Sequence, residues 1–255
     1  MNCNIPTDIV FSFTGFATRG GGCDVHKDGW GIAFFEGNGV RHFVDHEPAV
    51  VSPVASLIRR WPIKSKNVIS HIRRATQGEV ALENCHPFVR ELWGRYWVFA
   101  HNGDLKEFHP NFDGPYRPVG FTDSERAFCY ILQELRRRFG DSQPSLKNLH
   151  AALQQLMREI AAHGPFNMLL SNGSAMFAHC STKLVYLLRQ HPFAQATLAD
   201  EDLCVDFSEV TTPNDRVIII VTEPLTANEP WQQFNEGEMK VFIDGVPIEN
   251  ELNWL

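Results

Sequence analysis

Two nearly continuous apolar runs constrain the fold of this chain more than any other feature. They are residues 67–73 (NVISHIR) and 95–101 (RYWVFAH), and both are rich in β-branched or aromatic side chains bounded by loops. A strand with one solvated face alternates apolar and polar residues, so unbroken apolarity indicates strands that are covered on both faces. The sequence therefore predicts a β-sheet sandwiched between other layers.

Further strands are expected on either side of these runs. Residues 30–35 and 40–44 predict a hairpin, because the intervening Gly37-Asn38-Gly39 readily supplies positive φ. Five later apolar runs, several of them followed by Asn-Gly or Asp-Gly turns, also predict strands: residues 166–170, 176–179, 183–188, 217–222 and 239–243.

Two helices are expected in the middle of the chain. Thr122-Asp123-Ser124-Glu125 has the form of a capping box, so a helix should begin at Asp123, and a second should run over residues 146–162 before Gly164-Pro165. Many strands of antiparallel type, without regular βαβ alternation, favour an α+β layered domain over a doubly wound sheet. Residues 113–121 and 200–215 are interpreted as surface loops.

Length and composition favour one domain spanning residues 1–255. The net charge of -7 argues against a nucleic-acid partner, and no apolar stretch is long enough to cross a membrane, so a cytoplasmic protein is expected. The six cysteines form no Cys-x-x-Cys pair and are interpreted as free thiols. Cys23/His26 and Cys85/His86 match no standard zinc spacing, so no metal site is predicted.

Four short segments place polar residues where predicted strands end or a helix begins. In chain order they are HIRRATQG (71–78), NCHPF (84–88), AHNGD (100–104) and TDSE (122–125). Together, in this order, they resemble the glutaminase domain of the class II glutamine amidotransferases. That resemblance implies the four-layer αββα sandwich of the N-terminal nucleophile hydrolases. Segments such as RGGG (19–22), HKDGWG (26–31) and TEPLT (222–226) extend it to a bacterial single-domain branch, over residues 4–231.

The resemblance implies a role for each of six residues. Glutamine requires a cation for its α-carboxylate, an anion for its α-ammonium and oxyanion donors at its amide carbon. Arg73 would bind the carboxylate through its planar fork of donors, and Asp123 would bind the ammonium. Asn102 and Gly103 would form the oxyanion hole, and the same pocket would be lined by Thr76 and His86.

Each of these residues also has an ordinary structural interpretation. An arginine such as Arg73 can form a surface salt bridge, and an acidic residue such as Asp123 is favoured in the first turn of any helix. A histidine before proline, such as His86, is commonly a hydrogen-bonding loop residue. Asn-Gly is a common turn dipeptide. The functional assignment therefore depends on the four segments together.

The family's nucleophile is an N-terminal cysteine whose own α-amino group acts as the base. This chain begins Met1-Asn2-Cys3, and Met1 aligns with an internal Met of the branch. The first few family residues, including the nucleophile, are therefore expected to be missing, and the chain as given is expected to be inactive. Cys3 is a poor substitute, because Asn2 discourages removal of Met1. A start assigned to a downstream Met and a genuine loss of hydrolysis both remain open.

The leading hypothesis is therefore hydrolysis of a γ-glutamyl amide through a thioester, in the full-length form. The substrate would be glutamine, with ammonia passed to a companion subunit, or another γ-glutamyl compound. No cofactor is implied, and the oligomeric state is not determined by the sequence. A non-catalytic glutamine-binding or γ-glutamyl-binding subunit is the alternative. A hydrolase using Cys85 with His86 is disfavoured, because neighbours on an extended segment point to opposite sides.

Overall fold

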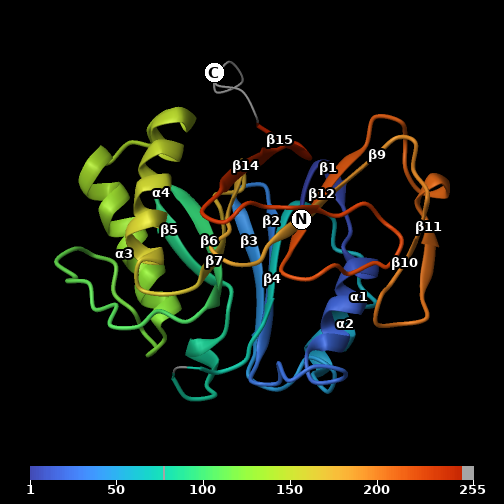
Figure 1. The fold of residues 1–255 in the computed structure, drawn as a ribbon, viewed down its shortest axis with the longest axis horizontal. Coiled ribbons are helices and arrows are strands. Elements are labelled where there is room, and N and C mark those ends of the chain that lie inside the picture. Colours follow the sequence, from blue (N-terminus) through green and yellow to red (C-terminus); the bar gives the residue numbers. More distant parts are fainter. Residues whose placement is uncertain (77, 249–255) are drawn as a thin grey trace.

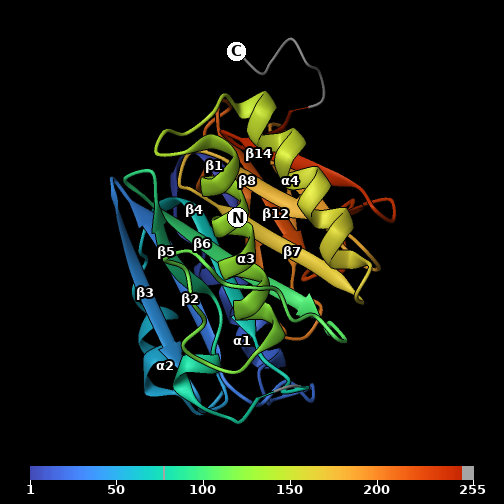
Figure 2. The same ribbon diagram turned by 90° about the vertical axis from the view of Figure 1, so that its left-hand side faces the viewer.

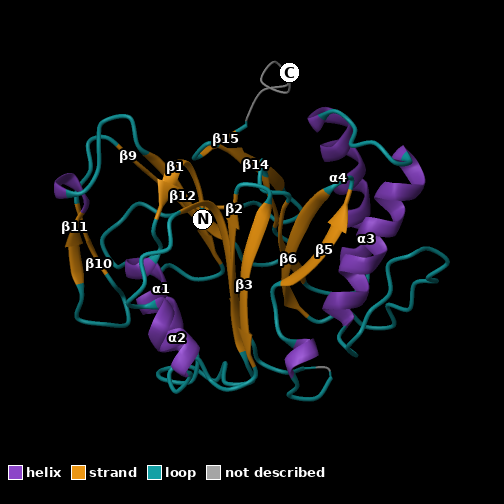
Figure 3. Cartoon of the chain, turned by 180° about the vertical axis from the view of Figure 1, so that it is seen from behind, coloured by secondary structure: helices purple, strands orange, loops and turns teal. Residues whose placement is uncertain are grey.

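The computed structural model describes residues 1–76 and 78–248 and shows four stacked layers (Figure 1). From left to right in that view, a pair of helices is followed by two β-sheets and then by a second pair of helices. The view from behind shows the same succession (Figure 3). The expected αββα sandwich is therefore confirmed.

The larger sheet contains seven strands in the order β13-β9-β12-β1-β4-β2-β3. The predicted hairpin forms one of its edges, with pairs running from Trp30↔Asp45 to Glu36↔Gly39. The turn has its positive φ, 57°, at Gly37. The strands are β1 (Asn2–Thr7), β2 (Trp30–Glu36), β3 (Gly39–Asp45), β4 (Ser65–Ile72), β9 (Val185–Gln190), β12 (Arg216–Val221) and β13 (Gln232–Gln233).

The smaller sheet contains six strands in the order β15-β14-β8-β7-β6-β5. A separate two-stranded ribbon, β10–β11, lies at the far right of Figure 1. The six strands are β5 (Phe88–Leu92), β6 (Arg95–Gly103), β7 (Phe166–Ser171), β8 (Met176–His179), β14 (Met239–Ile243) and β15 (Val246–Pro247), and the ribbon comprises β10 (Gln195–Thr197) and β11 (Cys204–Asp206).

Helices α3 (Asp123–Phe139) and α4 (Leu146–Ala161) cover the smaller sheet, as Figure 2 shows face on. The hydroxyl of Thr122 caps α3 by accepting the Glu125 N–H at 3.1 Å, as predicted. The Glu125 carboxylate, however, accepts the N–H groups of Val119 and Gly120 and pairs with Arg90. It thereby fastens the preceding loop to the helix.

The N-terminal part of the chain contains elements that the sequence analysis did not assign. They are β1, α1 (Val10–Arg19) and α2 (Pro53–Ile58). The α1 sequence, VFSFTGFATR, is poor in strong helix formers, so its helix depends on burial of Phe13 and Ala17 against the larger sheet. The prediction of a plain surface loop over residues 200–215 was wrong in part, because β11 and η2 (Phe207–Glu209) lie there.

Three apolar layers separate the four structural layers. One lies under α3 and α4, one under α1 and α2, and the middle one lies between the sheets. Because side chains alternate along a strand, β6 sends Phe99 toward the helices and both Val98 and Ala100 toward the larger sheet. Among the described residues, no helix is long and apolar enough to span a bilayer.

Candidate active site

A cavity of about 400 Å³ lies between the sheets and extends to α1. The smaller sheet contributes Ala100, Asn102 and Met168 to its wall, and the larger sheet contributes Ser70, His71, Ile220 and Thr222. Helix α1 and the residue before it contribute Ile9, Phe13 and Phe16. Since α1 packs on the outer face of the larger sheet, the cavity passes through that sheet.

The passage lies between β4 and β12, in line with β1. β1 occupies the space between these two strands only as far as Asn2, which pairs with Asn67 on one side and Ile218 on the other. Met1 exchanges main-chain hydrogen bonds with Val68, the amino group donating at 2.8 Å and the carbonyl accepting at 2.9 Å. Beyond this point, the cavity lies between β4 and β12.

Asn102 and Gly103 end β6 at the wall of this cavity. They do not form a turn, because they continue the ladder with β7 through the pairs Asn102↔Asn167 and Gly103↔Phe166. Asn102 lines the cavity, and its carbonyl accepts the Asn167 Nδ2–H group at 3.2 Å. A Cβ on Gly103 would lie 1.8 Å from the Pro165 oxygen, so only glycine fits there.

Arg73 directly follows β4, and its side chain is 3% exposed. The guanidinium donates to the Asp28 and Glu79 carbonyls at 3.3 and 3.2 Å and to the Gly78 carbonyl at 3.4 Å. The Asp28 carboxylate accepts the Ala75 N–H at 2.8 Å. Backbone oxygens and Asp28 thus hold the loop around a buried cation.

Asn84, which is fully buried, connects this loop to the start of α3. Its Nδ2 donates to the Glu79 carbonyl at 2.9 Å, and its Oδ1 accepts the Phe121 N–H at 3.0 Å. Asp123 lies two residues farther on and accepts the Leu105 N–H at 2.8 Å. Asn84 therefore ties the loop that follows Arg73 to the loop before α3, the helix that Asp123 begins.

Three imidazoles lie at or next to the cavity: His71 and His101 line it, His86 packs against His71, and all but the half-buried His71 are buried. The ring of His86 lies 4.2 Å from that of His71, and both nitrogens of His86 lack a hydrogen-bond partner among the described residues. Burial lowers the pKa of His71 to about 3 and that of His86 well below its usual value. Burial also lowers the pKa of His101, although the Asp123 carboxylate opposes the shift. All three are therefore neutral near pH 7.

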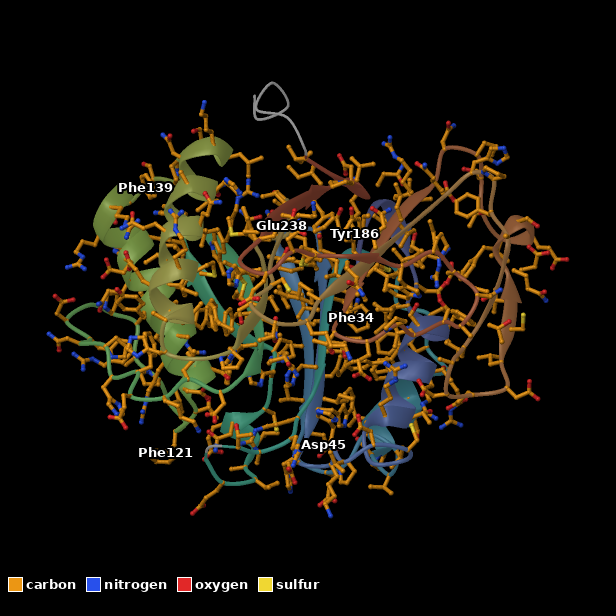
Figure 4. All side chains as sticks on the ribbon, viewed as in Figure 1. Phe34, Asp45, Phe121, Phe139, Tyr186 and Glu238 are labelled. Carbon is orange, nitrogen blue, oxygen red and sulfur yellow. The ribbon has the colours of Figure 1, made fainter. Side chains whose placement is uncertain are left out.

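The six predicted residues occupy different positions around the cavity. Asn102 lines it, whereas Arg73, His86 and Asp123 are buried in the surrounding loops and Gly103 is half-buried. Thr76 is exposed on the loop after β4, and Gln77 of the same segment lies outside the described residues. The loop before α3 carries Phe121, which is 66% exposed, at the lower left of Figure 4.

The sequence analysis assigned no role to several residues that build the site. Asp28, Asn84 and His101 all occur in the quoted segments, and they hydrogen-bond to backbone groups of Ala75, Glu79 and Pro165, respectively. The available signal was their polarity beside buried strands, because a buried polar group must find a partner. Across the part of the chain that the structure describes, no group of three His, Cys, Asp or Glu side chains could hold a metal ion.

The cysteines discussed above lie away from the cavity wall. The Cys3 thiol lies 3.3 Å from the carbonyls of Ser65 and Lys66, and burial raises its pKa. The Cys85 thiol lies against the carbonyls of Asp45 and Ala81, and burial raises its pKa to about 11. Neither is a reactive thiolate at neutral pH, because the thiolate is the nucleophilic form.

Comparisons with known proteins give matches over nearly the whole chain. The family described as "Glutamine amidotransferases class-II" matches residues 1–253. "Putative glutamine amidotransferase YafJ" of Escherichia coli (strain K12) is 51% identical over 245 residues, which are 96% of each chain. The crystal structure of a "predicted glutamine amidotransferase" from Pseudomonas aeruginosa PA01 superimposes with a TM-score of 0.78 at 45% identity, over 98% of each chain.

A more distant structure shows how widely the fold is shared. Glutamine phosphoribosylpyrophosphate amidotransferase from B. subtilis superimposes with a TM-score of 0.55 at 14% identity, over 94% of this chain and 45% of that one. At this identity the likeness concerns the fold alone. The two chains share the layered fold.

Proposed function

Because the chain belongs to the class II glutamine amidotransferases, we propose that it hydrolyses the amide of a γ-glutamyl compound through a thioester. The observation that carries this proposal is the position of Asn102 at the cavity wall, beside loops that present Arg73 and Asp123. Asn102 lines the cavity, and Arg73 and Asp123 are buried in the segments next to it, which gives an amide donor, a cation and an anion. That is the set of groups that an α-amino acid with a distal amide requires.

The reaction has two halves. A thiolate adds to the amide carbon, and the oxygen that becomes negative accepts hydrogen bonds from the Asn102 amide and the Gly103 N–H. Collapse of this intermediate breaks the C–N bond, and the amine leaves with a proton. Water then attacks the thioester, and glutamate and the free thiol are released. Arg73 and Asp123 hold the substrate throughout by its α-carboxylate and α-ammonium.

We further propose that residues preceding Met1 supply the thiol. None of the described residues lining the cavity is a cysteine, and beyond Asn2 the cavity lies between β4 and β12, the two strands that pair with β1. Continuing β1 with the register of Asn2↔Asn67 would require about four or five residues to reach the level of Ile72 and Arg73. A cysteine there would stand beside the loop that carries Arg73.

The test compares the chain as given with an N-terminally extended chain that begins at the nearest in-frame upstream Met. Release of glutamate would be measured from L-glutamine and a panel of γ-glutamyl amides. Only the extended chain should turn over, and replacing the cysteine in the extension with Ala should abolish turnover. An upstream stop codon without an intervening Met would refute the extension. An extended chain that releases no glutamate from any compound of the panel would refute the hydrolase function.

A second candidate function is a binding subunit without hydrolysis. This function is favoured by the absence of a cysteine from the described residues that line the cavity. Ligand at 100 times its dissociation constant should stabilise either protein by about 2.7 kcal/mol, so thermal shift does not separate the two functions. Measured turnover of a γ-glutamyl amide separates them, because only the hydrolase releases glutamate.

For the hydrolase, ammonia would pass to a partner protein if glutamine is the substrate. A preference for a bulkier γ-glutamyl amide would remove that requirement.

A further inference from the structure

His101 and Ser124 form a contact behind the oxyanion residues. His101 precedes Asn102 on β6 and points to the opposite face, where its side chain is buried against the start of α3. Its Nδ1 lies 2.8 Å from the Ser124 hydroxyl, and its Nε2 lies 3.1 Å from the Pro165 carbonyl. Ser124 is also buried.

The chemistry of the partners fixes the direction of both hydrogen bonds. A carbonyl only accepts, so Nε2 must carry the proton that is donated to Pro165. Because burial lowers the pKa of His101, the ring is neutral and Nδ1 is an acceptor. The Ser124 hydroxyl therefore donates to Nδ1. The result is a directed chain from Ser124 through His101 to Pro165.

A second hydrogen bond joins the same two segments. The Leu105 N–H donates to the Asp123 carboxylate at 2.8 Å, two residues beyond Gly103. The two contacts thus join residues 101 and 105 of the oxyanion segment to two adjacent residues of α3, one on each side of Asn102 and Gly103. The His101 ring also underlies Gly103, since a Cβ there would lie 2.6 Å from Nε2.

We propose that His101 and Ser124 are positioning residues that set the distance between the oxyanion donors and Asp123. This inference rests on the proposed function, because that distance matters only if Asp123 binds the substrate's ammonium. The amide carbon of a γ-glutamyl group lies one methylene farther from the ammonium than that of asparagine. The contact between His101 and Ser124 therefore favours γ-glutamyl over β-aspartyl amides.

The test is Ser124→Ala in the N-terminally extended chain. We expect kcat for the γ-glutamyl amide to fall roughly tenfold with KM within about twofold, and selectivity over asparagine to fall by at least about threefold. Ser124→Thr, which keeps the hydroxyl, should restore most of kcat. The control is Ser171→Ala at the end of β7, which removes a buried hydroxyl that donates to the Ala175 carbonyl. It should change neither kcat nor selectivity.

A second readout does not require turnover. In the chain as given, Ser124→Ala should accelerate hydrogen exchange of the Asp104 and Leu105 amides by about tenfold, because those amides donate to Pro165 and Asp123. Ser171→Ala should leave both rates unchanged. Unchanged exchange, or unchanged kcat and selectivity, in Ser124→Ala would overturn the positioning role. Absence of turnover in the unsubstituted extended chain would instead overturn the proposed function.

Discussion

The two ends of the candidate site are built in different ways. At the oxyanion end, Asn102 and Gly103 are held by main-chain pairing with β7, inside a continuous six-stranded sheet. At the other end, Arg73 lies on a loop that side chains and isolated carbonyls hold in place, with Asn84 as the connection to α3.

This difference matches what each end has to do. Oxyanion donors stabilise a transition state only if they are already in place, and a paired strand fixes them without reorganisation. A loop is easier to displace, and displacement there changes how well the α-carboxylate and α-ammonium bind. We therefore expect substitutions at the oxyanion end to affect kcat and substitutions at the loop end to affect KM.

The largest expected effect is at the oxyanion end. In the N-terminally extended chain, Asn102→Ala should lower kcat by about 10²- to 10³-fold with little change in KM, because one donor to the developing oxyanion is removed. Steady-state glutamate release measures both constants. Asn148→Ala, on the exposed face of α4, is the control. A fall in kcat below about threefold would count against an oxyanion role for Asn102.

Arg73→Lys tests the loop end and should have the next largest effect. Lysine keeps the charge but cannot reproduce the planar fork, so KM for the γ-glutamyl substrate should rise about 10- to 100-fold while kcat changes by less than about threefold. Calorimetric binding of glutamate to the chain as given provides a check without turnover. Arg74→Lys, at the exposed neighbouring position, is the matched control. An unchanged KM would remove Arg73 from the carboxylate site.

The same contrast explains how much of the molecule could be predicted from the sequence. The sequence predicted β6, β7, α3 and α4, because the spacing of their apolar residues and the Thr122 cap depend only on residues close together in the chain. α1 was not, since its aromatic and β-branched residues form a helix only when Phe13 and Ala17 pack on the sheet. β1 was not assigned because its pairing partners are distant in sequence.

The site follows the same pattern. Asn102 and Gly103 were identified from a motif, but their place in a strand and not in a turn depends on pairing with Asn167 and Phe166. The role of Asn84 depends on two loops that meet only in the folded chain. Local sequence therefore indicates which polar residues are candidates for the site, whereas their partners are known only from the tertiary structure.

Asn84→Ala tests whether one side chain holds the loop end together. The change leaves the Phe121 N–H without its partner and removes one of two donors to the Glu79 carbonyl, and should lower the free energy of unfolding by about 1–3 kcal/mol. KM should rise with it, while kcat at saturating substrate changes little. Urea unfolding and steady-state kinetics measure these effects. Asn84→Asp keeps the acceptor for the Phe121 N–H, so its stability and its KM should lie between those of the unsubstituted protein and Asn84→Ala. Equal KM values in all three proteins would show that Asn84 does not connect the loops functionally.

The smallest expected effect concerns His71, which lies on β4 between the two ends. Its pKa is about 3 in the folded protein because burial disfavours the charged ring, against about 6.5 when unfolded. The unfolded chain therefore binds the extra proton first. Stability is complete above pH 6.5 and is lost as the pH falls toward 3, at no more than about 1.4 kcal/mol per pH unit for this group.

His71→Asn should flatten the fall in unfolding free energy between pH 6.5 and 5.5 by up to that amount. Urea unfolding at pH 7.5, 6.5 and 5.5 measures it, and His109→Asn on the exposed surface controls for loss of a histidine as such. Parallel curves for the unsubstituted and His71→Asn proteins would show that His71 takes up a proton as readily in the folded as in the unfolded chain. The imidazoles between the two ends would then be solvated, and kcat and KM effects should no longer separate cleanly between the oxyanion end and the loop end.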